Sequence, residues 1–221
     1  VEKTRASGKT TVEFSRDYRI DGKTVSLVKR YTFADGEYLF SHEVELQGGA
    51  EETAAVPYAL VLGPQIGSDF KTLSIRTDYR HFVYQGERKK RSFATTGGSI
   101  TRVEDLSGWC GIEGKYFTLL AAVPGAGYTV YLDSRSIEGI RRRSAVVLQH
   151  NAAGATEASP AGAGSYYYFD PKKKEYLLRY NRAETNAFGV SGFNLDRSLA
   201  EPRLIGRIAN VLKGILSLFY A

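Results

Sequence analysis

The sequence alternates polar and apolar residues across two Asp-Gly pairs, and this pattern restricts the fold more than any other feature. From Thr10 to Leu46 the alternation is interrupted at Asp21-Gly22 and again at Asp35-Gly36. Asp-Gly between runs of β-forming residues is a strong hairpin signal, because both residues tolerate the positive φ that a two-residue turn requires. We therefore expect an antiparallel meander that ends at Gly48-Gly49.

Short β-type segments continue as far as Phe169. Expected strands occupy residues 54–62, where Pro57 marks an edge or a bulge, and residues 82–84, 99–103, 128–132, 144–150 and 165–169. At 221 residues and 43% hydrophobic composition, the chain is long and apolar enough to bury a sizeable core. We expect one large all-β domain rather than two small ones, with the small-residue segment 151–164 as a surface loop.

The stretch Leu106–Pro124 carries the strongest core signal. Its apolar run, residues 119–123, is closed by Pro124-Gly125, which is typical of a strand buried on both faces. Its three glycines allow the backbone to bend or to approach a neighbouring strand closely. We expect four of its side chains to be largely buried: Trp109, Cys110, Tyr116 and Phe117.

Four consecutive aromatic residues, Tyr166–Phe169, precede a lysine run at residues 172–174. A platform for stacking bases or sugars is one interpretation. Alternation along a strand would instead bury two of the four rings, and we favour this packing role. Periodicity leaves open whether residues 172–181 form a short helix or an irregular strand.

Sustained helical periodicity is confined to residues 201–221, which we separate from the β domain of residues 1–200. Pro202 suits a first helical turn, and the apolar residues that follow fall on one side of the helix. Its basic residues argue against crossing a bilayer. We expect its N-terminal half to pack on the sheet and its C-terminal apolar residues to be left for the membrane interface or an adjoining membrane domain. The residues expected to face the membrane or a partner are Arg203, Arg207, Ile208, Val211, Lys213, Ile215, Leu216 and Phe219.

The net charge of +6 includes basic runs at residues 87–91, 141–143 and 172–174. We interpret these runs as solvated loops, since dispersed runs indicate nucleic acid less well than one continuous basic face, and we expect no nucleic-acid partner. An anionic membrane surface would suit them equally well. The chain begins at Val1 and contains no Met, so we expect it to be part of a longer protein.

The sequence has no recognisable catalytic or metal-binding pattern. His42, His81 and His150 are far apart, and none has a second ligand at metal spacing. The paired carboxylates at residues 51–52 and 104–105 lie in polar segments, where solvation explains them better than acid–base catalysis. We expect no catalytic residue, no metal and no cofactor, and we do not expect an enzyme.

Three segments resemble, in order and spacing, the large periplasmic domain of YidC-type bacterial membrane-protein insertases. They are Val28–Tyr38, the Gly-Trp to Tyr-Phe segment Gly108–Phe117, and Tyr168–Lys173. The amphipathic helix then occupies the place of the family's helix before the insertase core. The family's opening strands have no counterpart, so we expect part of the sandwich to be absent or rearranged.

This resemblance implies an antiparallel β-supersandwich, similar in fold to galactose mutarotases, on the periplasmic face of the bacterial inner membrane. It implies a non-catalytic domain that assists the insertion and folding of inner-membrane proteins. The implied partners are SecDF and other Sec translocon components, nascent inner-membrane proteins and the membrane surface. The fold alone would equally allow a carbohydrate-binding or mutarotase-like sandwich.

Overall fold

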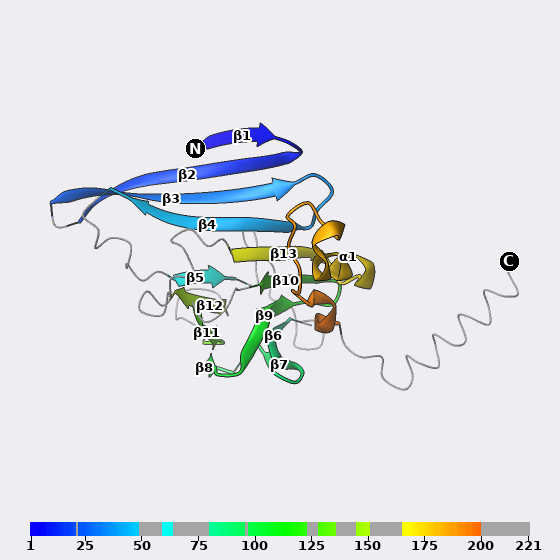
Figure 1. The fold of residues 1–221 in the computed structure, drawn as a ribbon. Helices are drawn as coiled ribbons and strands as arrows, with labels where there is room; N and C mark the ends of the chain where they lie inside the picture. Colours follow the sequence, from blue (N-terminus) through cyan, green and yellow to red (C-terminus); the bar gives the residue numbers. More distant parts are fainter. Residues whose placement is uncertain are drawn as a thin grey trace, which may run out of the picture.

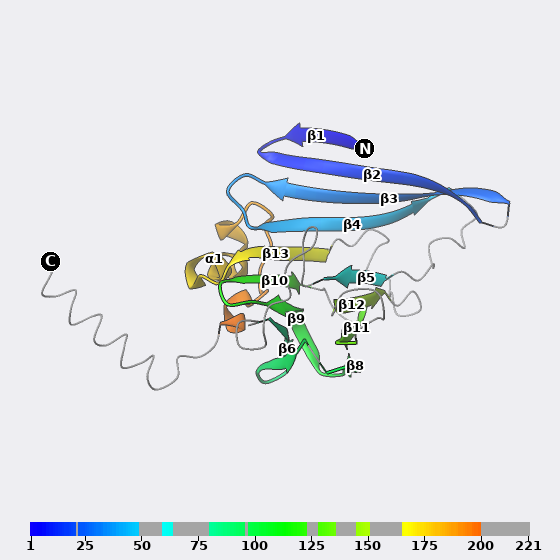
Figure 2. The ribbon, with the colours of Figure 1, turned by 180° about the vertical axis from the view of Figure 1, so that it is seen from behind.

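The computed structural model describes residues 1–20, 22–48, 59–63, 80–95, 97–122, 128–135, 145–150 and 165–199. Within these ranges the chain forms two antiparallel sheets that face each other (Figures 1 and 2). The expected all-β sandwich is confirmed.

The larger sheet has nine described strands in the order β1-β2-β3-β4-β13-β10-β9-β6-β7. Their bounds are β1 Glu2–Ala6, β2 Lys9–Ile20, β3 Lys23–Ala34, β4 Leu39–Gln47, β13 Ser165–Pro171, β10 Phe117–Ala122, β9 Leu106–Glu113, β6 His81–Gly86 and β7 Lys90–Ala94. The smaller sheet has four described strands, β5 Ala59–Leu62, β12 Ala145–His150, β11 Tyr128–Asp133 and β8 Ile100–Val103, in that spatial order.

The expected meander of β2, β3 and β4 is confirmed. β2 and β3 pair along their whole lengths, from Lys9 opposite Ala34 to Ile20 opposite Lys23. Gly22 and Gly36 have φ of 77° and 72°, the left-handed conformation that makes glycine the favoured residue in these turns. Strands β1 and β7 were not expected from the sequence, and the first two residues of β7 belong to the basic run 87–91 that we interpreted as a loop.

The first core lies between the two sheets. On the larger sheet it includes Phe82, Cys110 and Tyr167, and on the smaller sheet Val130 and Val146. Cys110 has no exposed surface, as expected, and burial raises the pKa of its thiol to about 12. We call the sheet face that carries these residues the inner face.

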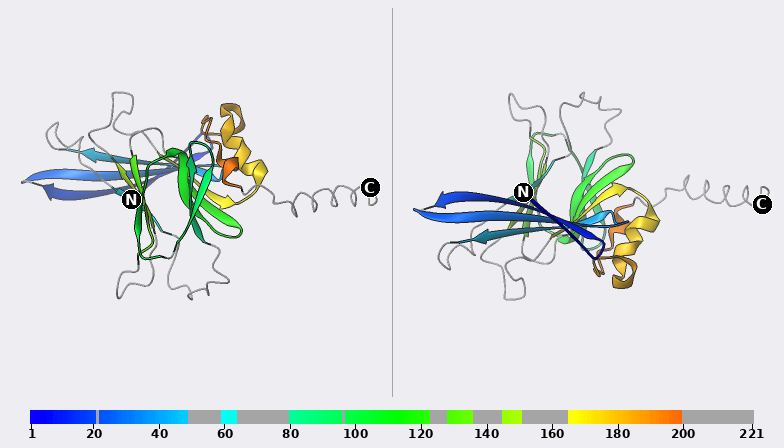
Figure 3. Two further views of the ribbon diagram at one scale, coloured as in Figure 1. Left: turned by 90° about the horizontal axis from the view of Figure 1, so that it is seen from below. Right: turned by 90° about the horizontal axis from the view of Figure 1, so that it is seen from above.

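The second core lies on the opposite face of the larger sheet, beneath residues 174–199, which we call the outer layer (Figure 3). This layer contains α1 Lys174–Leu178 and three short 3-10 turns, Arg179–Asn181, Ala183–Thr185 and Leu195–Ser198. The alternative left open for residues 172–181 is therefore resolved as a short helix. Trp109 and Tyr168 are fully buried beneath the outer layer.

The centre of the larger sheet is packed tightly on both faces. A Cβ added to Gly111 would lie 1.9 Å from the Leu119 carbonyl oxygen, so the close approach of β9 and β10 requires glycine there. Tyr167 and Tyr168 point to opposite faces and are both buried, 4% and 0% exposed. Two of the four aromatic rings are thus buried as expected, but they are neighbours because both faces are covered.

Two burial predictions are wrong. Tyr116 is 64% exposed and Phe117 is 55% exposed, whereas Trp109 of the same stretch is fully buried as expected. Tyr116 lies in the turn between β9 and β10, and Phe117 is the first residue of β10. Burial of this stretch therefore does not extend to the β9–β10 turn and the first residue of β10.

An ionic cluster joins the outer layer to the sheet. Lys90 Nζ lies 2.8 Å from both carboxylate oxygens of Glu113, and Lys172 Nζ lies 3.0 Å from Glu113 Oε2. Lys90 Nζ also donates to the Ser198 carbonyl at 2.7 Å, and Trp109 Nε1 donates to the Asn194 carbonyl at 3.2 Å. These bonds fix the end of the outer layer against β7 and β9.

Candidate functional site

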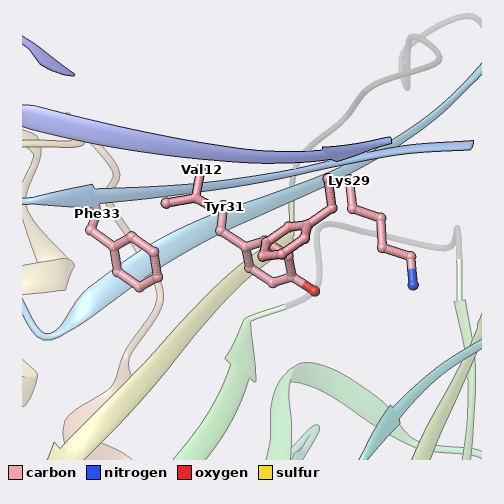
Figure 4. A pocket seen from close by; sticks show the side chains of 5 residues that line it. Val12, Lys29, Tyr31 and Phe33 are labelled. Carbon is pink, nitrogen blue, oxygen red and sulfur yellow. The ribbon is translucent and has the colours of Figure 1, made fainter. Parts of the chain in front are cut away.

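The ribbon of β2, β3 and β4 has one polar and one aromatic face. Arg30 bonds Glu13 and Glu45 on the polar face. On the other face most of the alternate residues are apolar, although Lys29 and His42 also lie there, and this face continues the inner face of the sheet. Figure 4 shows the side chains of Val12, Lys29, Tyr31 and Phe33 on this second face of the ribbon, and Phe14 lines the same hollow.

The smaller sheet covers only part of the inner face. Its edge strand β5 lies near the middle of the larger sheet, and the β2–β3 ribbon extends away from it (Figure 1). As a result Phe14 is 45% exposed and Phe33 is 44% exposed, although both lie on the same face as the buried Tyr167. Large apolar side chains without cover are typical of binding surfaces.

Two adjoining hollows follow this boundary, and together we call them the aromatic groove. The first has a volume of about 590 Å³ and is lined by Val12, Phe14, Lys29, Tyr31 and Phe33. The second, of about 460 Å³, shares Lys29 and Tyr31 with the first. Its other lining residues are Phe40, His42, Ala59, Leu60, Val61, Leu62, Leu119, Tyr167 and Phe169.

Ring contacts give the groove a continuous aromatic floor. Phe14 meets Tyr31 edge to face with centroids 5.9 Å apart, and Phe40 stacks on Tyr167 at 5.4 Å. Phe33 lies 5.3 Å from Phe40. Because each ring is held by neighbours, the floor is largely formed before any ligand arrives.

His42 is a polar group in this apolar setting. It is 4% exposed, its ring lies 4.6 Å from that of Tyr31, and its Nε2 is buried with no hydrogen-bond partner among the described residues. Burial, together with the nearby Lys29 charge, lowers the pKa of His42 to about 4. At neutral pH His42 is therefore an uncharged imidazole buried beneath the groove.

The groove suits apolar ligands better than sugars. Its described polar groups are Lys29, the Tyr31 hydroxyl, His42 and backbone, and no carboxylate is among the lining residues. A sugar site needs several hydrogen-bonding side chains around the stacking ring, whereas an extended apolar chain needs an apolar floor and few polar contacts. No acid–base pair lines the groove.

The sequence-predicted site residues lie outside the described residues. Arg203, Arg207, Ile208, Val211, Lys213, Ile215, Leu216 and Phe219 all belong to segment 201–221, so their membrane-facing role stays a prediction. The aromatic groove was missed, although the alternating Val12, Phe14, Tyr31 and Phe33 supplied its signal. Sequence reasoning treated these residues only as strand formers.

Two further searches concern the described residues only. No three His, Cys, Asp or Glu side chains gather there in a way that suits a metal ion. In the same ranges no helix combines the length and apolar character needed to cross a bilayer.

Comparisons of the sequence with known proteins identify a family and two relatives. The family model described as "YidC periplasmic domain" matches residues 2–195. The chain is 28% identical to the membrane protein insertase YidC of Treponema denticola over 234 aligned residues, which cover 99% of the chain and 39% of that protein. It is 27% identical to the same-named protein of Treponema pallidum over 232 residues, covering 88% and 36% respectively. The chain thus spans less than two-fifths of these relatives.

Proposed function

Because this chain belongs to the YidC periplasmic domain family, we propose that it is the non-catalytic periplasmic domain of an inner-membrane protein insertase. In this role it holds extended apolar segments of client membrane proteins in the aromatic groove. The observation that carries the proposal is the row of preformed, half-exposed rings, Phe14, Tyr31 and Phe33, beside the edge of the smaller sheet.

An extended segment matches the groove chemically. Alternate side chains of a strand point the same way, so one side of the client would contact the floor while the other faces solvent. β5 offers a strand edge along the groove, since it pairs only with β12 among the described strands.

A direct binding experiment tests the groove. A fluorescent ten-residue peptide of alternating Leu and Thr is titrated with the protein, and fluorescence anisotropy reports binding. The variant F14S/F33S is expected to bind at least about tenfold more weakly, because two ring contacts are lost. The matched control F93S/I100S changes two residues of comparable exposure outside the groove and is expected to bind as the unchanged protein does.

Three results would contradict the proposal. The first is an equal loss of peptide affinity in F14S/F33S and in the control F93S/I100S. The second is unchanged peptide binding by F14S/F33S. The third is binding of a peptide with every Leu replaced by Ser as tightly as the Leu/Thr peptide. Galactose binding that disappears in F14S/F33S would instead favour the alternative function, a carbohydrate-binding sandwich.

The proposed partners within the membrane rest on the family relationship. We expect the extracytoplasmic parts of SecDF and the Sec translocon to contact this domain, in addition to nascent inner-membrane proteins. Co-purification of the whole insertase with SecDF from membranes, compared with a version lacking this domain, measures that contact. Equal recovery of SecDF in both preparations would show that this domain is not needed for the contact with SecDF and would contradict this part of the proposal.

A further inference from the structure

One end of the sandwich gathers tyrosines and lysines from four separate segments, and all of them except the half-buried Tyr176 are exposed. These segments are the β3–β4 loop, the β9–β10 turn, the residues after β13, and α1, which meet on the right in Figure 1. The residues are Tyr38, Lys115, Tyr116, Lys173, Lys174 and Tyr176, and we call them the Lys–Tyr end.

Backbone and ring contacts make this a single surface. Lys172 N donates to the Tyr116 carbonyl at 2.8 Å, which joins the β9–β10 turn to the residues after β13. Phe169 N donates to the Tyr38 carbonyl at 3.1 Å, and the rings of Tyr38 and Tyr176 lie 4.9 Å apart. The four segments are therefore fixed relative to one another.

Aromatic rings and ammonium groups are paired at this end. Lys115 Nζ lies 5.1 Å from the Tyr116 ring centroid, and Lys173 Nζ lies 5.2 Å from that of Tyr176. Tyr116 is also among the most exposed aromatic residues described. Phe117 and Leu178 add exposed apolar surface beside these pairs.

The outward charge of this end is positive. Lys115, Lys173 and Lys174 are all exposed, whereas Glu113 is buried against Lys90 and Lys172. The exposed carboxylates in these segments are Glu175 and Asp35, and Asp35 is paired with Arg5 at 2.8 Å. One carboxylate oxygen of Asp170 is buried. Tyrosine rings beside lysines are the combination found where proteins meet lipid headgroups.

The path of the chain supports the same partner. α1 packs with Leu195 of the last 3-10 turn, and the described chain ends just beyond it at Leu199. The sequence continues into residues 201–221, whose pattern predicts a basic amphipathic helix. The Lys–Tyr end therefore lies beside the part of the domain that leads into this predicted helix.

We propose that the Lys–Tyr end is a docking surface for an anionic lipid bilayer. The lysines contact phosphate groups, and Tyr116, Tyr38 and Tyr176 lie at the level of the headgroups. This contact sets the orientation of the sandwich on the membrane, and it does not depend on the aromatic groove.

Vesicle binding tests the proposal on the full 221-residue chain. The probe is a vesicle of 30% phosphatidylglycerol in phosphatidylcholine, and co-sedimentation measures partitioning. To remove the contribution expected from the last helix, every protein also carries I215S/F219S. The variant K115E/K173E/K174E is expected to bind on the order of 100-fold more weakly, because each lysine near an anionic surface contributes about fivefold.

A matched control has the same change in net charge at the opposite end. R16E/R19E/K23E reverses three exposed cations near the β2–β3 hairpin tip, on the left in Figure 1, and is expected to bind within about threefold of the parent. Equal weakening of the two variants would show that net charge alone attracts the vesicle and would overturn the proposal. No weakening in K115E/K173E/K174E would overturn it as well.

A fluorescent label reports the contact site directly. Tyr116→Cys accepts an environment-sensitive dye while buried Cys110 does not, and its emission should shift to the blue on phosphatidylglycerol vesicles. The same dye at Arg19→Cys should not shift. A shift at Arg19 and not at Tyr116 would place the membrane at the wrong end, and a shift only with a Sec protein present would assign the surface to a protein partner.

Discussion

The inner face of the larger sheet has a covered part and an uncovered part, and the two are built from the same kinds of residue. Beneath the smaller sheet, Phe82 and Tyr167 are 1% and 4% exposed, whereas on the β2–β3 ribbon Phe14 and Phe33 are 45% and 44% exposed. Alternation decides which face of a strand is apolar, but the extent of the opposing sheet decides whether that face becomes core or binding surface.

The largest expected loss of stability is at the centre of the larger sheet, which is covered on both faces. Trp109→Ala removes a fully buried ring and its hydrogen bond to Asn194, and should lower the free energy of unfolding by about 3–5 kcal/mol. Tyr116→Ala, seven residues away but exposed, should cost less than about 1 kcal/mol. Urea denaturation measures both, and similar losses would mean that exposure does not separate these neighbours.

The comparison is tested most directly by one substitution made on each part of the inner face. Phe82→Ala should cost about 3–4 kcal/mol, because it leaves a cavity between the sheets. Phe14→Ala should cost less than about 1 kcal/mol, because its ring is already half in solvent. A large loss from Phe14→Ala would show that the ribbon is covered in solution.

His42 lies at the boundary between the two parts and should make folding sensitive to acid. As pH falls below about 6.5, His42 gains a proton in the unfolded chain, whereas in the folded protein its imidazole stays neutral down to about pH 4. Stability should therefore be lost across this window, by about 3 kcal/mol in total. His42→Phe should flatten the dependence of the denaturation midpoint on pH, and an unchanged slope would contradict the lowered pKa.

The smallest effects concern ion pairs on the two parts. Glu113→Gln leaves Lys90 and Lys172 facing each other in a largely buried site and should cost about 1–2 kcal/mol. Glu13→Gln breaks a more exposed contact with Arg30 and should cost less than about 0.5 kcal/mol. Thermal denaturation ranks the two, and the reverse order would show that the ribbon is held more tightly than its exposure indicates.

The sequence supported the prediction of most strands but not of the layers over them. Asp35-Gly36 located a hairpin because its turn chemistry is local, and Trp109 was correctly expected to be buried. The outer layer was not predicted, since Phe188, Phe193 and Leu195 have no regular period and are ordered by contacts with a distant sheet. For the same reason the groove was missed: whether Phe14 is covered depends on β5, which is 45 residues away along the chain from Phe14 to Ala59.

The short strand β1 has a consequence for how copies of the molecule behave toward one another. Every residue of β1 is exposed, and three of its five side chains, those of Glu2, Lys3 and Arg5, carry charge. β1 pairs with Lys9–Glu13 of β2, and without it this part of the β2 edge would present unpaired backbone groups, a template on which a second molecule could add its own strand. A charged edge of mixed sign is a poor template, because another β1 would bring like charges and buried ammonium groups into the new ladder. We therefore expect these five residues to oppose the addition of a second molecule's strand at the part of the edge next to the aromatic groove.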